Sequence, residues 1–517
     1  MTAARPYFLT TPIYYVNDLP HLGHAYTTVA CDALARFMRL DGHRVKFLTG
    51  SDEHGQKVEQ SARAAGLSPQ QFCDRISPAW REMTKLLNIS NDDFIRTTEP
   101  RHLRGVEALW QALEKRGEIY LGRFAGWYAV RDEAFYAESE LVDGPGGKKL
   151  APTGADVEWL EEENYFFRLS AWQDRLLAWY DANPDAVAPR SRRNEVISFV
   201  KSGLNDLSVS RTSFSWGVPV PGHPGHVVYV WVDALINYIT ALGYPDTGGE
   251  YATFWPADLH MVGKDIVRFH SVYWPAFLMA AGLEPPRRVF AHGWWTVEGQ
   301  KMSKSLGNFI PPKQLVDKYG LDPVRYFLLR ELPFGNDGDF SHRAIVGRLN
   351  GDLANDFGNL AQRVLSMINR NCGAQVPEPG AFTAEDEQLL GEARGLLERV
   401  RPEMAEQAFH AALETIWRVV AAGNRYVDEQ APWALRRSDP QRMQTVLYTL
   451  AEVLRYLAIL VQPFVPDAAS ALLDQLAVPA TARRFADLAQ PLPPGRPLPA
   501  PHGIFPRYVE AEAAASD

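Results

Sequence analysis

Two short polar segments, far apart in the chain, carry side chains suited to binding phosphate groups. One is His21-Leu22-Gly23-His24, near the N-terminus, and the other is Lys301-Met302-Ser303-Lys304-Ser305-Leu306-Gly307, far downstream. The two imidazoles can donate hydrogen bonds to phosphate oxygens, and Gly23 leaves room for a flat base to approach the backbone. Two mobile ammonium groups flanked by hydroxyls suit a departing pyrophosphate, whose charge grows in the transition state. The pair indicates chemistry on a nucleoside triphosphate.

Each segment taken alone also has a structural explanation. His21 and His24 can be surface or helix-capping residues, and a lysine-rich loop is a common solvated feature. The assignment to chemistry therefore depends on the two segments together and on the elements that place them.

Alternating strand and helix patterns surround the first segment. Residues 7–11 form a short apolar run that Pro12 closes, and residues 24–40 follow with a helical pattern. Residues 45–48 indicate a second buried strand, and residues 101–116 a further helix with one apolar face. Strands separated by helices predict a parallel sheet with helices on both faces. In such a doubly wound, Rossmann-like sheet, the turn from the first strand into its helix is the natural nucleotide site.

Downstream, the pattern of the chain changes twice. After residue 117 it becomes aromatic and turn-rich, with a hairpin or loop tip at 144–147, and strand patterns return at 227–232, 259–263 and 289–292. After about residue 341 leucines recur at helical spacing, which favours an antiparallel helical bundle. We therefore expect an α/β doubly wound catalytic domain, a mixed connective insertion and an all-α bundle. The expected segments are the first catalytic half at 1–117, the insertion at 118–216, the second catalytic half with the lysine loop at 217–341, the bundle at 342–480 and a proline-rich tail, extended or disordered, at 481–517.

Composition limits the class of protein and its location. With 517 residues, 46% hydrophobic and 22% charged, the chain can bury a large core in roughly three domains. Its net charge of −9 does not indicate a nucleic-acid partner, although an acidic enzyme can keep one local basic face. The three cysteines form no C-x-x-C pair and the N-terminus lacks signal-peptide features, which together favour the reducing cytoplasm. The most apolar stretch, 445–465, contains Glu452 and Arg455, so it predicts a buried helix and not a membrane span.

The HLGH and KMSKS segments, in this order and in these contexts, resemble the two signatures of class I aminoacyl-tRNA synthetases. Four further segments are similar to the methionyl branch of that family, at residues 11–17, 49–55, 229–234 and 263–270. The resemblance covers about residues 6 to 480. It implies ATP-dependent activation of L-methionine to methionyl-adenylate and transfer to the 3′ end of tRNA(Met), initiator and elongator. It also implies that the helical bundle binds the anticodon.

The resemblance implies roles for individual residues. Asp52 would pair with the α-ammonium of methionine, although it can also simply cap the following helix. Asp265 matches a position near the adenosine. A methionine thioether gains from aromatic contact, and the Tyr15 hydroxyl is suited to reach the sulfur. The expected methionine pocket is formed by Ile13, Tyr15, Trp231, Ala234, Tyr238, Ile266, Phe269 and His270, and the expected anticodon readers are Asn359 and Arg363, one helical turn apart, with Trp433 as a stacking platform.

The sequence departs from the family pattern in the insertion and after the bundle. In the insertion, many relatives bind zinc through cysteine knuckles. In residues 126–133 of this chain, Ala129 and Asp132 occupy positions where such relatives have cysteines. Without thiolates we expect no structural zinc, and only Mg²⁺ accompanying ATP. Leu235 replaces a proline of some relatives, which affects local packing. The appended dimerising module of the family is not found after the bundle, so we expect a monomer.

The resemblance predicts an in-line attack of the methionine carboxylate on the α-phosphate of ATP, and the nucleophile is already ionised at neutral pH. His21 and His24 would bind the phosphates, with Lys301, Ser303 and Lys304 on the departing pyrophosphate. Three alternatives remain. Another class I synthetase would carry a longer editing insertion or cysteine ligands to zinc, a small-molecule nucleotidyltransferase would not need the bundle, and a non-enzymatic tRNA-binding relative typically loses one signature. Pyrophosphate exchange across a panel of amino acids separates them.

Overall fold

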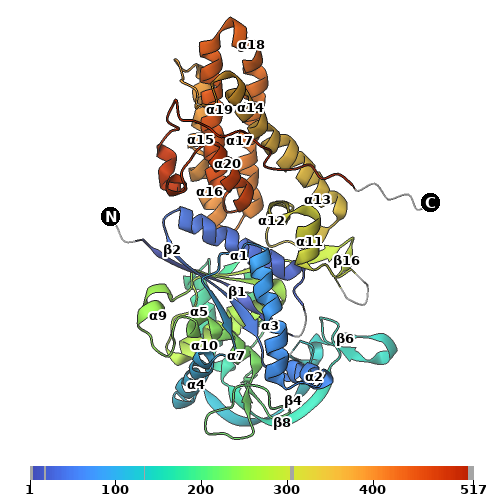
Figure 1. Cartoon of the computed structure of the whole chain (residues 1–517). Coiled ribbons are helices and arrows are strands. Elements are labelled where there is room, and N and C mark those ends of the chain that lie inside the picture. The colour runs from blue at the N-terminus through green and yellow to red at the C-terminus, as the bar shows by residue number, and fades with distance from the viewer. Residues whose placement is uncertain (1–3, 17–18, 133, 303–307, 511–517) are drawn as a thin grey trace, which may run out of the picture.

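A six-stranded parallel sheet lies at the centre of the catalytic half of the chain (Figure 1). The structure is a computed structural model and describes residues 4–16, 19–132, 134–302 and 308–510. The strands of the sheet are β1 (Pro6–Tyr15), β2 (Arg44–Asp52), β3 (Asp93–Arg96), β9 (Val187–Ala188), β13 (Leu259–Gly263) and β14 (Val289–His292). Their order is β3-β2-β1-β13-β14-β9, and every neighbouring pair is parallel.

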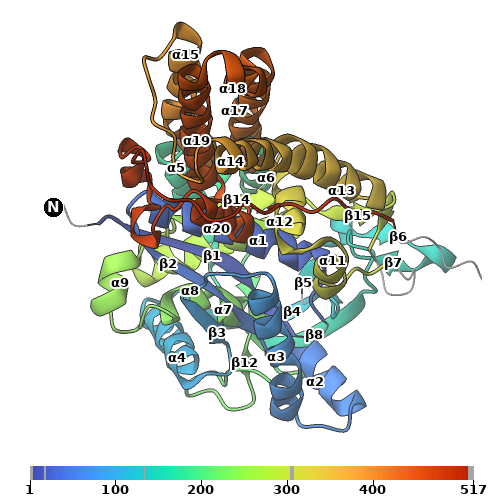
Figure 2. The same cartoon turned by 45° about the horizontal axis from the view of Figure 1, so that its top comes forward.

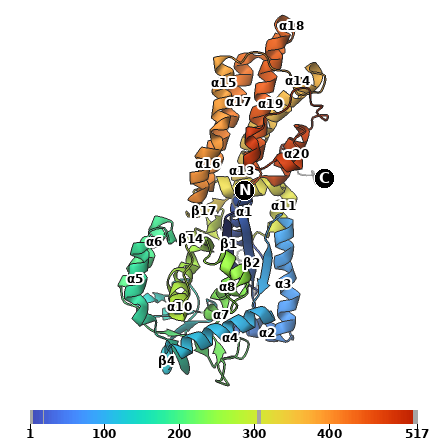
Figure 3. The same ribbon diagram turned by 90° about the vertical axis from the view of Figure 1, so that its left-hand side faces the viewer.

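The central strands are buried on both faces. Phe8 and Leu48 belong to the apolar core on one side of the sheet, whereas Leu9 and Phe47 belong to the core on the other, because successive strand residues point to opposite faces. Figure 3 shows α3 on one side of the sheet and α5, α6 and α10 on the other. The covering helices are α1 (Leu22–Leu40) and α3 (Pro69–Leu86) on the first side, and α4 (Pro100–Lys115), α5 (Gln173–Ala182), α6 (Arg190–Lys201) and α10 (Trp274–Ala281) on the second.

The strand order reverses between β1 and β13. The chain leaves β1 through α1 on one face of the sheet and leaves β13 toward α10 on the other. In doubly wound sheets, ligands bind at the carboxyl ends of the strands where this reversal occurs. The HLGH turn, Asp52 and Asp265 all follow or end strands at this edge. The expected doubly wound fold is confirmed.

The connective insertion forms its own antiparallel sheet. Its strands are β4 (Ile119–Ala129), β5 (Ala134–Tyr136), β8 (Glu158–Phe167) and β10 (Leu207–Ser208), and the hairpin of β6 (Val142–Asp143) and β7 (Lys149–Leu150) encloses the expected tip at 144–147. The middle of the insertion does not belong to this antiparallel sheet. Its elements α5, β9 and α6 return to the main sheet, where β9 pairs with β14. The insertion therefore contributes one edge strand to the catalytic sheet.

The strand expected at 227–232 is wrong beyond its second residue. Only β12 (Val227–Val228) is a strand, paired antiparallel with β11 (Ser210–Arg211), and α7 (Val230–Leu235) begins at once. A short apolar run is compatible with either element, and tertiary packing decides between them. The remaining elements of this half are α2 (Gln56–Ala64), α8 (Asn237–Thr240), α9 (Gly249–Phe254), β15 (Trp295–Val297), β16 (Gln300–Lys301), β17 (Gly338–Phe340), α11 (Pro312–Tyr319) and α12 (Leu321–Arg330).

A helical bundle stands on the catalytic half, as Figures 1 and 2 show. A π-helical segment, η6 (Leu349–Gly358), joins α13 to α14 and leads the chain into it. The helices are α13 (His342–Arg348), α14 (Asn359–Asn371), α15 (Ala384–Arg394), α16 (Leu396–Ala405), α17 (Phe409–Gln430), α18 (Pro432–Ser438), α19 (Pro440–Val461) and α20 (Pro466–Gln475). Helix α19 is long and apolar enough to cross a membrane by length and composition, but it is buried in the bundle.

The two charges inside apolar α19 hold the C-terminal tail. Arg455 pairs with Glu452 at 2.8 Å and donates to the Leu488 carbonyl at 3.0 Å, while Glu452 accepts the backbone N–H of Leu492. The tail was expected to be extended or disordered. Its first part instead contains a 3-10 helical turn, η8 (Phe485–Ala489). From residue 490 to 510 it is extended and packed, with Leu492 and Phe505 buried against the bundle.

A buried ion pair between α12 and the catalytic helix α1 lies where the catalytic half meets the bundle. Arg325 of α12 and Asp32 of α1 are both fully buried and lie 2.7 Å apart. The same guanidinium donates to the carbonyls of Leu87, Pro463 and Phe464, so α1, the end of α3 and the end of α19 meet at one side chain. Burying a charge is costly unless its hydrogen bonds are satisfied, and here they are. This contact fixes the bundle relative to the helix that begins with HLGH.

Candidate functional site

The HLGH segment forms the N-terminal cap of α1. The Gly23 backbone N–H donates to His21 Nδ1 at 3.0 Å, and the His21 backbone N–H donates to His24 Nδ1 at 3.1 Å. A backbone N–H can only donate, so Nδ1 of each ring is the acceptor and Nε2 is its donor. A Cβ on Gly23 would meet His21 Cε1 at 2.9 Å, so a side chain here would push the His21 ring out of its capping position. The capping explanation and the phosphate-binding explanation are therefore compatible.

The ring of His24 is held on several sides. It lies edge-on to Tyr14 at 5.1 Å and to Trp80 at 4.7 Å between ring centres, and 3.8 Å from His21. Burial, together with the neighbouring His21 ring, lowers the pKa of His24 well below its usual value. His24 is therefore neutral at pH 7 and acts as a positioned hydrogen-bond donor.

The chain that follows the lysine loop lies against this cap. The Leu22 backbone N–H donates to the Ile310 carbonyl at 3.0 Å, and Phe309 packs edge-on to His21 at 5.6 Å. On the other side of the loop, β16 ends at Lys301 and pairs with β15. Ser303 and Lys304 lie outside the described residues. The HLGH segment thus contacts the residues that follow the lysine segment, although the two are distant in the sequence.

A further contact joins α1 to strand β14, which precedes the lysine segment in the chain. His292, at the end of β14, lies 2.7 Å from the Thr27 hydroxyl of α1 through Nε2, and its Nδ1 lies 2.8 Å from the Gly293 carbonyl. A carbonyl only accepts, so Nδ1 carries the proton and Thr27 donates to Nε2. Burial lowers the pKa of His292, which keeps this arrangement at neutral pH. The sequence analysis did not single out His292.

Asp265 lies just after β13 at the same edge. Its Oδ1 accepts the indole N–H of Trp294 at 3.0 Å. Lys264 lies 4.4 Å over the Trp294 ring and pairs with Asp337 at 2.6 Å. The adenosine-side carboxylate predicted from the family is therefore oriented by a tryptophan and bordered by a cation.

The predicted methionine residues come together from four segments of the chain. Trp231 stacks on Phe269 with ring centres 3.8 Å apart and an angle of 10° between planes. The Tyr238 hydroxyl lies 2.7 Å from His270 Nε2, and His270 Nδ1 donates to the Ile266 carbonyl, 2.9 Å away. Burial lowers the pKa of His270 to about 4, so the ring is neutral and its Nε2 accepts a hydrogen bond from the Tyr238 hydroxyl.

Further predicted residues lie at the ends of β1 and β2. Tyr15 and Asp52 are register partners there, and Ile13 pairs with Gly50. Asp52 is buried, and Ala234 is also buried, one helical turn after Trp231. Phe269 and His270 begin the π-helical turn η5 (Phe269–Tyr273), a geometry that often marks functional sites. A carboxylate and an aromatic wall thus lie on neighbouring strands and helices at the switch point.

The predicted anticodon residues lie on two neighbouring helices of the bundle. Asn359 begins α14 and is exposed, and Arg363 lies one turn later. The Arg363 guanidinium lies 5.7 Å from the ring centre of Trp433, which is 51% exposed, and pairs with Asp428 at 2.7 Å. An exposed tryptophan beside an arginine suits stacking on an unpaired base. Sequence reasoning did not identify Asp428.

Among the described residues, no group of three or more His, Cys, Asp or Glu side chains is arranged to hold a metal ion. In the segment 126–133, Asp132 accepts hydrogen bonds from Thr153 and, at 3.1 Å, from Tyr136. Arg131 donates to the same carboxylate at 3.0 Å. The Asp132 carboxylate thus accepts hydrogen bonds from two hydroxyls and one guanidinium.

Comparisons with known proteins show the family of this chain. Two families match: "tRNA synthetases class I (M)" over residues 7–365 and "Anticodon binding domain of methionyl tRNA ligase" over residues 376–516. The methionine–tRNA ligase of Brucella suis biovar 1 is 59% identical over 507 residues, 98% of each chain. That of Mycobacterium tuberculosis H37Rv is 55% identical over 511 residues, again 98% of each chain. The solved M. tuberculosis methionyl-tRNA synthetase in complex with methionyl-adenylate matches with a TM-score of 0.96 and 54% identity over 97% of this chain and all of that one, and its free form matches with 0.90.

Proposed function

This chain belongs to the class I methionyl-tRNA synthetases, and we propose that the residues at the carboxyl ends of its central strands carry the two steps of that reaction. The enzyme activates L-methionine with ATP to methionyl-adenylate and transfers the methionyl group to tRNA(Met). The observation that carries the residue assignment is the contact of the HLGH cap with Ile310 and Phe309, directly after the lysine loop.

In the first step the methionine carboxylate attacks the α-phosphate and pyrophosphate leaves. His21 and His24 donate through Nε2 to phosphate oxygens, since Nδ1 of each is occupied by the cap. Because His24 is neutral, it adds a directed donor without an added charge. Lys301, Ser303 and Lys304 bind the departing pyrophosphate, whose charge grows as the bond breaks. Mg²⁺ enters with ATP as part of the substrate.

The methionine pocket has a charged end and an aromatic end. Asp52 pairs with the α-ammonium, and Tyr15 lies beside it in register. Trp231, Phe269 and His270, with Ile13, Ala234, Tyr238 and Ile266, surround the thioether. Asp265, held by Trp294, contacts the adenosine. Catalysis then consists of positioning and electrostatic stabilisation.

The second step requires tRNA to reach both halves of the molecule. Trp433 stacks an anticodon base, while Asn359 and Arg363 read base edges, supported by the proximity of Arg363 to Trp433. We further propose that the enzyme works in the cytoplasm as a monomer. Three free thiols fit a reducing compartment, and sedimentation of the purified chain tests the oligomeric state.

Amino-acid-dependent ATP–pyrophosphate exchange tests the residue assignment. With methionine as substrate, His24→Asn should lower kcat about 10²–10³-fold, the usual loss for one oxyanion-type donor. Asp52→Asn should raise the KM for methionine about tenfold or more and leave the KM for ATP unchanged, because a charge-assisted pair is worth about 1.5–3 kcal/mol. A His24→Asn enzyme within threefold of the parent, or Asp52→Asn with an unchanged KM, would contradict these roles.

A further inference from the structure

A fully buried carboxylate, outside the residues that face methionine, ties two sides of the pocket together. Asp233 lies in α7 between Trp231 and Ala234. Its Oδ2 accepts from His54 Nδ1 at 2.6 Å, and its Oδ1 accepts from His102 Nε2 at 2.7 Å. Asp233 and His102 have no exposed surface and His54 has almost none. The three residues come from α7, the end of β2 and α4, which are distant in the chain.

The carboxylate is ionised in the folded protein. Burial alone would raise the pKa of Asp233, but the two histidines lower it to about 2. An ionised carboxylate only accepts hydrogen bonds, so both bonded ring nitrogens carry protons. Charge-assisted bonds of this kind are short and directional, and they are stronger in a buried environment. The contact is therefore a rigid one.

The position of Asp233 on α7 shows which side chains depend on its hydrogen bonds to the two histidines. Residues two apart on a helix point to opposite sides, whereas residues three apart share a face. Trp231 and Ala234 thus face methionine together, while Asp233 faces the interior. Helix α7 has six residues, and its N-cap residue makes no side-chain capping bond, so its orientation depends on tertiary contacts. The two histidines provide directional contacts of this kind.

The turn that carries His54 is also held by further contacts. His54 comes two residues after Asp52, and its ring packs edge-on to Trp216 at 5.2 Å. Trp216 in turn donates to the Glu53 carbonyl at 2.6 Å and accepts from the Gly55 backbone N–H at 3.0 Å. The turn that follows Asp52 is therefore joined to α7 by a histidine–carboxylate hydrogen bond.

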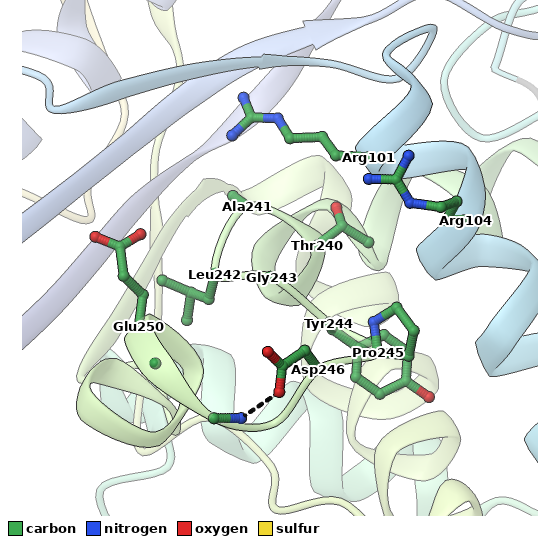
Figure 4. A pocket seen from close by; sticks show the side chains of 12 residues that line it. Arg101, Arg104, Thr240, Ala241, Leu242, Gly243, Tyr244, Pro245, Asp246 and Glu250 are labelled. Carbon is green, nitrogen blue, oxygen red and sulfur yellow. Dashed lines mark hydrogen bonds between the residues drawn. The ribbon is translucent and has the colours of Figure 1, made fainter.

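His102 extends the network to a surface pocket. Its Nδ1 lies 3.0 Å from the Thr240 hydroxyl of α8. The approach of α4 to α8 depends on Gly105, where a Cβ would meet Thr240 Cγ2 at 2.1 Å. Thr240 lines a pocket of about 280 Å³ together with Arg101 and Arg104 (Figure 4). None of the predicted methionine residues lines this pocket.

We propose that Asp233, held by His54 and His102, is a positioning residue that sets the distance between the ammonium-binding Asp52 and the aromatic wall of Trp231. The proposal rests on the proposed function, because it takes Asp52 and Trp231 as methionine contacts. Asp233 itself does not touch the substrate. The network determines which side-chain length fits between the charged end and the aromatic end of the pocket.

The test compares methionine with ethionine, its homologue longer by one methylene, in pyrophosphate exchange by the full-length enzyme. One methylene in an apolar pocket changes kcat/KM about 10–200-fold. Asp233→Asn places an amide N–H against one of the two ring donors. It should raise the KM for methionine about tenfold, leave the KM for ATP within twofold, and reduce the preference for methionine over ethionine at least threefold.

Matched variants keep the result interpretable. Thr240→Val removes the outer bond to His102, together with the bond of the Thr240 hydroxyl to the Asn237 carbonyl in the same helix. It should shift the same two quantities in the same direction by about two- to threefold, and it serves if Asp233→Asn does not fold. Asp246→Asn, in the pocket of Figure 4, should leave both within twofold. An equal fall in kcat for both amino acids, with KM and preference unchanged in both Asp233→Asn and Thr240→Val, overturns the proposal, because loss of folded enzyme acts in that way.

Asp52→Asn, measured in parallel, distinguishes failure of the positioning role of Asp233 from failure of the proposed site assignment. If Asp52→Asn raises the KM for methionine and Asp233→Asn does not, only the positioning role fails. If Asp52→Asn itself has no effect, the proposed site assignment fails.

Discussion

Asp322, where the catalytic half meets the bundle, makes the stability of the enzyme depend on pH. It lies in the first turn of α12, and its Oδ2 accepts the backbone N–H of Ala468 in α20 at 2.6 Å. Burial raises the pKa of this carboxyl from 3.8 to about 6, aided by the charge of Asp467 and opposed by the Ala468 bond and by Arg325. Oδ1 has no hydrogen-bond partner among the described residues.

The sign of the effect follows from the direction of this shift. The folded protein binds the proton more tightly than the unfolded chain, so the stabilisation is complete below pH 3.8 and is lost as pH rises through about 6. A shift of about two units corresponds to roughly 3 kcal/mol of unfolding free energy. At pH 7.5 the folded enzyme therefore holds an ionised, poorly solvated carboxylate at its domain junction.

Asp322→Asn should remove that cost and still accept the Ala468 bond through its amide oxygen. We expect the variant to be more stable than the parent by roughly 3 kcal/mol at pH 7.5 and by about half of that at pH 5. Urea unfolding midpoints of both proteins across this range measure the difference. Asp317→Asn, at a well-exposed position on α11, is the control and should change stability by no more than about 0.5 kcal/mol at any pH. A destabilised Asp322→Asn at pH 7.5, or a difference independent of pH, would refute the reasoning.

Three further changes test other parts of the molecule. Lys304→Ala should lower the rate of methionine activation about 10²–10³-fold, and a rate within threefold of the parent would exclude the role in pyrophosphate departure. Trp433→Ala should raise the KM for tRNA in aminoacylation about 5–100-fold, because stacking one base is worth about 1–3 kcal/mol, and should leave pyrophosphate exchange unchanged; an unchanged KM for tRNA contradicts the stacking role. Arg325→Met, which leaves Asp32 buried without its fully buried cationic partner, should lower the unfolding free energy by about 3–5 kcal/mol in urea, whereas Arg343→Met at an exposed position should change it little.

The sequence allowed the architecture to be predicted because that architecture depends on local patterns. Alternating strands and helices predicted the doubly wound sheet, and helical leucine spacing predicted the bundle. The expected helix at 101–116 is found as α4 (Pro100–Lys115), and the strand at 45–48 as the core of β2. Boundaries were less predictable, since β1 continues past Pro12 with a shift of register between Thr10 and Ile13.

The two histidines of HLGH show where competing interpretations of one motif can both be correct. From the sequence, a capping role and a phosphate-binding role were alternatives. The structure assigns the capping bonds to Nδ1 of His21 and His24. Capping therefore fixes the tautomer, and with it the nitrogen that can donate to a phosphate. The motif alone cannot show which ring nitrogen caps the helix and which can donate to a phosphate, because this depends on backbone geometry at the start of α1.

Long-range polar partners could not be predicted, yet the sequence does carry a signal for their existence. Asp32, Asp233 and Glu452 each stand inside an apolar segment, and burying a carboxylate is unfavourable unless it is paired. Each is buried and bonded to a group brought by another segment: Arg325, His54 with His102, and the Leu492 backbone. An ionisable residue within an apolar helical pattern thus predicts a buried polar contact with another segment, while the fold alone determines the partner. Each such contact here holds two elements at a fixed separation. Replacing one of these carboxylates with an amide should therefore alter function although the residue does not touch a substrate.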